Sequence, residues 1–165
     1  MVEATDVAKQ ALDFASAPAR LRPRDPLLLE RLAEVGFLAS ECGLHAHAER
    51  AFVCLSALRP GNPSPLIALA MVRARRGALT EAMTDLRALI AAQPDCDLAR
   101  AMLATMIIHM RQAGALELLQ TVLTTGSDPA AIEIARCWID LAREHEQAPA
   151  PTVPAEFFRR HSIRS

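Results

Sequence analysis

Residues 29–94, LERLAEVGFLASECGLHAHAERAFVCLSALRPGNPSPLIALAMVRARRGALTEAMTDLRALIAAQP, contain two consecutive windows that match at an offset of 34 residues. A glycine, a proline, small residues and large apolar residues all recur at this offset. The matched pairs are Leu32 and Leu66, Val35 and Leu69, Gly36 and Ala70, Gly43 and Gly77, Ala48 and Ala82, Phe52 and Leu86, Leu55 and Leu89, and Pro60 and Pro94. A fixed period of this length is typical of a solenoid, in which each helical unit packs on its neighbours.

The composition favours helices over a sheet. The chain has 165 residues, of which 52% are hydrophobic and only 4% aromatic, and it contains no Tyr. Sheets are enriched in β-branched and aromatic side chains, whereas the Ala and Leu that are abundant here are good helix formers. We therefore predict an all-α fold in one domain, which is the number typical of this length.

Prolines and apolar periodicity divide the chain into three parts. We expect residues 1–26 to hold an amphipathic helix over 2–17 and a proline-rich linker, and residues 147–165 to form a disordered tail. Residues 27–146 are predicted to be a helical solenoid of about three helix pairs with a C-terminal capping helix. The helices are expected at about 26–42, 45–58, 65–76, 80–92 and 97–112, around 116–123, and at 129–146.

Several residues indicate where these helices begin and end. Asp25 followed by Pro26 is typical of an N-cap and first helical position, and Thr80 is a second candidate N-cap. Gly43 is expected to end the first helix of its unit, since glycine adopts the left-handed conformation common there. In the third unit the glycine, Gly114, comes three places late, so we expect the helix before it to be lengthened.

The repeat also predicts which residues hold the helices together. Ala48 and Ala82 are expected where the two helices of each unit approach most closely, because a small side chain allows close packing. Phe52 and Leu86 are expected to fill the space beside them. These four residues are predicted to be structural.

Charge and hydropathy exclude some partners and locations. The formal net charge of −1 provides no basic surface for nucleic acid. The N-terminal sequence lacks an apolar core of signal-peptide length, and no apolar run is long enough to span a bilayer. We therefore expect a cytoplasmic protein without membrane insertion. Four widely spaced cysteines, Cys42, Cys54, Cys96 and Cys137, are expected to be free thiols in that reducing compartment.

The sequence does not support catalysis. Patterns typical of phosphate loops, metal-binding helices and nucleophile elbows do not occur in it. His45 and His47 are two residues apart, which points them to different faces of a helix, so we interpret them as solvated rather than as metal ligands. We predict a protein that is not an enzyme and has no cofactor or metal.

The 34-residue period, with small residues at the eighth and twentieth places and a closing proline, resembles the tetratricopeptide repeat. The resemblance implies a superhelix whose concave side is lined by the first helix of each unit. In such repeats the second, fifth, ninth and twelfth residues of each unit face the concave side, and here most of them are apolar. The resemblance therefore implies an apolar partner-binding groove, formed by residues at these places and by Met102 beside them. They are Ala33, Phe37, Ile67, Met71, Ala74, Ala101, Met102, Thr105 and Ile108. Alternatively, some of them pack on the terminal helices or the tail.

The segments LLERLAEVGF, GLHAHAERAF and LRP, within residues 28–123, resemble the small cytosolic chaperones of bacterial type III secretion. The resemblance implies a chaperone that holds a secreted needle, tip or translocator subunit in the groove and prevents its premature assembly. Besides the client, the resemblance allows two further partners, which are a co-chaperone and a second copy of the chain in a homodimer. The alternative is a tetratricopeptide-repeat scaffold or assembly factor that joins subunits of a larger complex.

Two segments outside the repeats leave alternatives open. The helix expected at 2–17 either caps the solenoid or docks on another subunit. The tail, which contains Phe157 and Phe158, is either disordered or occupies the groove in place of a client.

Overall fold

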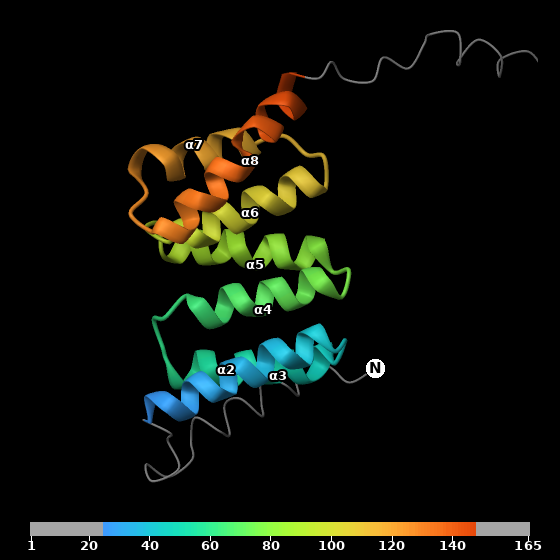
Figure 1. Cartoon of the computed structure of the whole chain (residues 1–165), viewed down its shortest axis with the longest axis vertical. Helices are drawn as coiled ribbons and strands as arrows, with labels where there is room; N and C mark the ends of the chain where they lie inside the picture. Colours follow the sequence, from blue (N-terminus) through green and yellow to red (C-terminus); the bar gives the residue numbers. More distant parts are fainter. Residues whose placement is uncertain (1–24, 148–165) are drawn as a thin grey trace, which may run out of the picture.

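A computed structural model describes residues 25–147 of the chain, and these form seven helices joined by short turns (Figure 1). The bounds are α2 (Pro26–Glu41), α3 (His45–Leu58), α4 (Ser64–Arg75), α5 (Leu79–Ala92), α6 (Asp97–His109), α7 (Ala115–Thr125) and α8 (Pro129–Gln147). The helix expected at 2–17, the linker after it and the tail from 148 onward lie outside the described residues.

The helices pack in sequential pairs. Each helix contacts the next one along the chain, so α2–α3, α4–α5 and α6–α7 form three stacked layers, and α8 packs on both α6 and α7 (Figure 1). This arrangement confirms the all-α prediction of about three helix pairs followed by a capping helix. Among the described residues, nothing packs on the outer side of α2 at the opposite end.

Aspartate side chains cap α2 and α8, and the cap of α2 is the one that the sequence predicts. The backbone N–H of Leu27 donates to Oδ1 of Asp25 at 3.0 Å, and Asp128 accepts from the backbone of Ala130 at 2.9 Å before α8. The prediction that Thr80 is an N-cap is wrong. Helix α5 begins one residue earlier, and helical bonding starts when the N–H of Ala82 donates to the carbonyl of Ala78. Thr80 therefore lies within the first turn.

The first helix of each unit ends in the same way. Gly43, Gly77 and Arg111 are spaced by 34 residues and all have positive φ, at 75°, 91° and 51°. The N–H of each donates to the carbonyl three residues earlier, at 3.2, 3.0 and 3.0 Å. The repeat is therefore still in register at Arg111.

The predicted lengthening of the third unit's first helix is wrong. Helix α6 ends at His109, and the extra residues lie in the turn, where Gly114 has φ 100° and precedes α7. The late glycine does not mark the end of α6, because Arg111 occupies the left-handed position there despite its Cβ.

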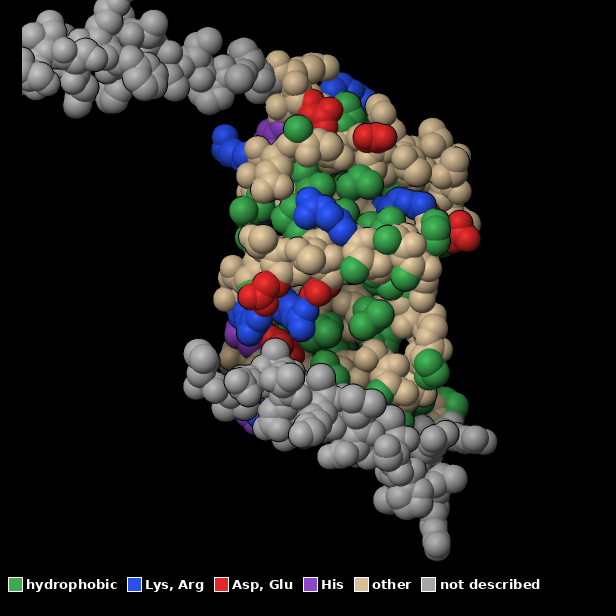
Figure 2. Space-filling view, turned by 180° about the vertical axis from the view of Figure 1, so that it is seen from behind, with side chains coloured by type: hydrophobic (Ala, Val, Ile, Leu, Met, Phe, Trp, Pro, Cys, Tyr) green, Lys and Arg blue, Asp and Glu red, His purple; other side chains and the backbone are tan. Residues whose placement is uncertain are grey.

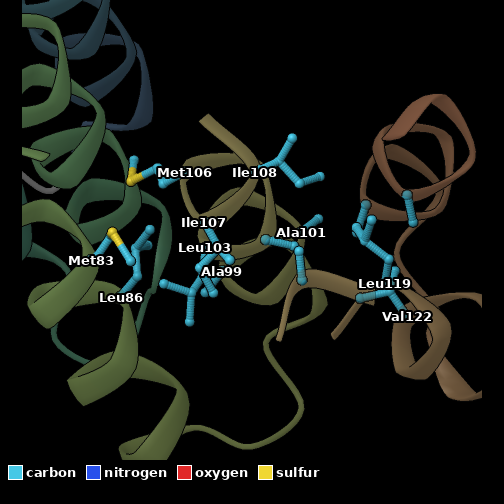
Figure 3. Packing of buried hydrophobic residues seen from close by; sticks show 14 of the residues in the cluster. Met83, Leu86, Ala99, Ala101, Leu103, Met106, Ile107, Ile108, Leu119 and Val122 are labelled. Carbon is cyan, nitrogen blue, oxygen red and sulfur yellow. The ribbon is translucent and has the colours of Figure 1, made fainter. Parts of the chain in front are cut away.

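The hydrophobic core has two clusters that meet at α4. Ala68, Leu69 and Val72 pack with α2 and α3, whereas Ile67 and Ala70 pack with the helices that follow. Figure 3 shows the second cluster between α5, α6 and α7. The predicted packing residues are buried: Ala48, Ala82 and Leu86 are 0% exposed and Phe52 is 1% exposed.

Candidate partner-binding groove

A pocket of about 370 Å³ lies between α2, α3 and α4. Its lining is mainly apolar, with polar groups from Glu30 and from the turn between α3 and α4. Helices α2 and α4 start at the same end of the array as this turn, which explains why their first residues line the pocket. The lining residues are Pro26, Leu29, Glu30, Ala33, Phe37, Phe52, Leu55, Arg59, Asn62, Ser64, Pro65 and Ala68.

Phe37 is the most exposed aromatic side chain in the described part of the chain. It is 52% exposed, whereas Phe52 beneath it is 1% exposed. The two rings meet edge to face, with centroids 4.9 Å apart and an angle of 62° between their planes. This contact is a favourable aromatic geometry. Phe37 is thus held on one side by the core and open to solvent on the other.

The structure places the predicted groove residues in different environments. Ala33 and Phe37 line the pocket. Ile67, Ala101 and Ile108 are buried, with exposures of 6%, 0% and 3%. The other four are partly buried: Met71, Ala74 and Met102 pack against the second cluster, and the Thr105 hydroxyl donates to the carbonyl of Ala101 at 2.9 Å.

Helix α8 explains part of this difference. It packs on α6, and its residues Ala131 and Ala135 belong to the same cluster as Ala101 and Ile108. The α6 end of the predicted groove therefore uses apolar side chains for internal packing. The end formed by α2, α3 and α4 presents an apolar pocket, which Ala33 and Phe37 line.

The sequence did not indicate Leu29, Leu55 or Pro65 as pocket residues. Leu55 comes from α3, the second helix of its unit, whereas Leu29 and Pro65 lie on first helices but at positions that the predicted groove did not include. A usable signal was the short turn at 59–63, since a turn of this length makes α3 and α4 antiparallel neighbours. It brings the C-terminal end of α3 beside the N-terminal end of α4.

An ion-pair network joins α3, α4 and α5. Arg76 lies 3.2 Å from Glu49 and 2.6 Å from Glu81, and Arg73 lies 4.0 Å from Glu49 and also pairs with Asp85. On the face shown in Figure 2, acidic and basic side chains lie beside one another between hydrophobic ones. The charges on that face are of both signs.

The described residues contain no cluster of three His, Cys, Asp or Glu side chains placed to hold a metal ion. All four cysteines are free, and burial raises the pKa of the Cys54 thiol, which lowers its thiolate fraction. Between residues 25 and 147, none of the helices is long and apolar enough to cross a membrane.

Comparison with known proteins identifies a shared fold and the family of the chain. No match was found among curated proteins. The crystal structure of PcrH from Pseudomonas aeruginosa matches with a TM-score of 0.62 and 18% identity, over 78% of this chain and 99% of the PcrH chain, which shows a shared fold. The model of the family described as bacterial type III secretion protein (HrpB1_HrpK) matches residues 22–144. The chain therefore belongs to this family of bacterial type III secretion proteins.

Proposed function

We propose that the protein is a non-catalytic chaperone that binds an apolar or amphipathic helix of a secreted needle, tip or translocator subunit. The observation that carries the proposal is Phe37, which is half exposed at the edge of an apolar pocket of about 370 Å³. Helix-in-groove recognition places anchor side chains of the partner helix in such pockets. Membership in a type III secretion family supports this class of partner.

The chemistry of such clients explains why a pocket of this kind is useful. Subunits that assemble outside the cell carry apolar helices, and these helices would associate prematurely if they were left exposed. A chaperone that covers one helix keeps the subunit unassembled until export. Because the client is held before export, the proposed site of action is the cytoplasm.

We place the centre of the proposed groove at the α2–α3–α4 end, because the apolar pocket there supports it. Client side chains would enter the pocket beside Ala33 and Phe37, which line it. Met71, Ala74, Met102 and Thr105 extend the proposed surface along α4 and α6, since each is only partly buried. Ile67, Ala101 and Ile108 are buried, so in this proposal they hold the helices together and do not contact the client.

Substitution of Phe37 by Glu tests the proposal. Each candidate subunit of the same secretion system would be co-expressed with the protein, and retention would be measured by co-purification. We expect Phe37→Glu to reduce retention of the client by about ten-fold or more, because a charge must then be desolvated in the groove.

The matched control is Leu44→Glu. Leu44 is 53% exposed, compared with 52% for Phe37, but it lies in the turn between α2 and α3 and does not line the pocket. Circular dichroism should show that both variants remain folded. Undiminished client retention by folded Phe37→Glu would contradict the groove, and would favour the alternative of a scaffold that joins subunits through another surface.

A further inference from the structure

The outer face of α2 carries four exposed apolar side chains. Leu27, Leu28, Val35 and Leu38 are 57%, 53%, 59% and 61% exposed. Helical spacing places them on the side of α2 that is turned away from Leu29 and Gly36, which are buried against the rest of the array. The exposed ion pair of Arg31 and Glu34 also lies on this side, so the face has apolar side chains at both ends and one ion pair between them. Four large apolar side chains gathered on one helix face indicate a contact surface.

The equivalent positions of the second and third units can be compared with this face of α2. At an offset of 34 residues, Val35 corresponds to Leu69 and then Leu103, and Leu38 corresponds to Val72 and then Met106. The four later residues are 8%, 4%, 1% and 5% exposed, in that order. The same positions are therefore buried in two units and exposed in the first.

The later residues are buried by the helix that precedes each of them. Leu69 and Val72 share a cluster with residues of α3, and Leu103 and Met106 share one with Met83 of α5, as Figure 3 shows. In both units the preceding helix covers this face of the following one. By the same rule, α2 requires a helix before it in the chain.

We propose that residues 2–17 form this helix and cover the outer face of α2 within the same molecule. The segment has 16 residues, as α2 does, and its apolar residues Val7, Ala11 and Phe14 recur at helical spacing. Two helices of this length can pack side by side over their whole extent.

The chain connection permits this packing. Residues 18–25 separate the segment from α2, and eight residues can span up to about 26 Å. Packed helices lie only about 8–10 Å apart. The connection from α3 to α4 needs only residues 59–63. A tethered segment also has a local concentration in the millimolar range, so it competes effectively with a second copy of the chain.

Hydrogen–deuterium exchange of the full-length protein tests the inference. The variants are Val7→Asp and Phe14→Asp, on the apolar side of the segment, and the control is Ser16→Asp, which adds the same charge away from that side. We expect the first two to speed amide exchange in α2 by about ten-fold or more, and the control to leave it unchanged. Exchange in α7 and α8 should not change in any of the three.

The measurement would use monomer isolated by size exclusion, together with any dimer fraction. The inference is supported if the amides of α2 are protected from exchange in the monomer and lose this protection in Val7→Asp and Phe14→Asp. Protection of α2 confined to the dimer would overturn it in favour of a second copy, and equal exchange in all variants would overturn it outright. Client retention separates this inference from the proposed groove, because Phe14→Asp should leave binding beside Phe37 intact.

Discussion

At the scale of single residues, Gly36 shows how closely the first two helices pack. A Cβ at this position would lie 2.9 Å from Cζ of Phe52, which is closer than carbon atoms normally approach. In the second and third units the corresponding residues are Ala70 and Ala104, and both are fully buried. Alanine fits in the second unit beside Leu86, whereas the ring of Phe52 requires glycine.

We predict that Gly36→Ala destabilises the protein. Alanine has the better helix propensity by about 1 kcal/mol, but overpacking costs about 1–3 kcal/mol, so the net effect should be a loss of up to about 2 kcal/mol. Urea unfolding measures this change. Adding Phe52→Leu should recover part of the loss, because it recreates the alanine and leucine pair of the second unit. A stabilised single variant would contradict the packing argument.

At the scale of elements, the turn between α6 and α7 departs from the other two. Arg111 has φ 51°, although its side chain makes this conformation unfavourable by about 1–2 kcal/mol. The structure keeps it because the N–H of Arg111 bonds the carbonyl of Ile108 and so completes the end of α6.

We predict that Arg111→Gly stabilises the fold. Relief of the left-handed conformation should exceed the extra entropy that glycine gives to the unfolded chain, leaving a gain of up to about 1 kcal/mol. Thermal unfolding of Arg111→Gly and Arg111→Ala would be compared, and the alanine variant should show no gain. Equal melting temperatures for the two variants would count against a conformational cause.

At the scale of the whole molecule, stability depends on contacts between neighbouring units, since each layer touches only the next. Helix α4 couples the two core clusters, and the ion pairs of Arg73 and Arg76 with Glu49 reinforce the junction between the first and second units. One end of the array is covered by α8, whereas among the described residues the outer face of α2 is uncovered.

We predict that Glu49→Gln weakens this junction only slightly. The side chains of Glu49, Arg73 and Arg76 are 21%, 26% and 38% exposed, so solvent screens the pairs and the loss should be about 1 kcal/mol or less. Urea unfolding at low and high salt tests this, because the difference between variant and parent should shrink as salt is added. A difference that is independent of salt would indicate a packing defect instead.

The sequence by itself determined the period, most of the buried packing residues and the helix bounds within one or two residues, except for the end of α6, which was placed three residues too late. These follow from local patterns, because apolar spacing, glycine and proline act over one or two helical turns. Only the tertiary structure decided which apolar residues are free to bind a partner. Phe37 and Ile108 both lie at places that the repeat assigns to the concave side, yet Phe37 is 52% exposed and Ile108 is 3% exposed. The exposure of a side chain depends on which segment packs against its helix, and that segment can come from a distant part of the chain. A local sequence pattern does not contain this information.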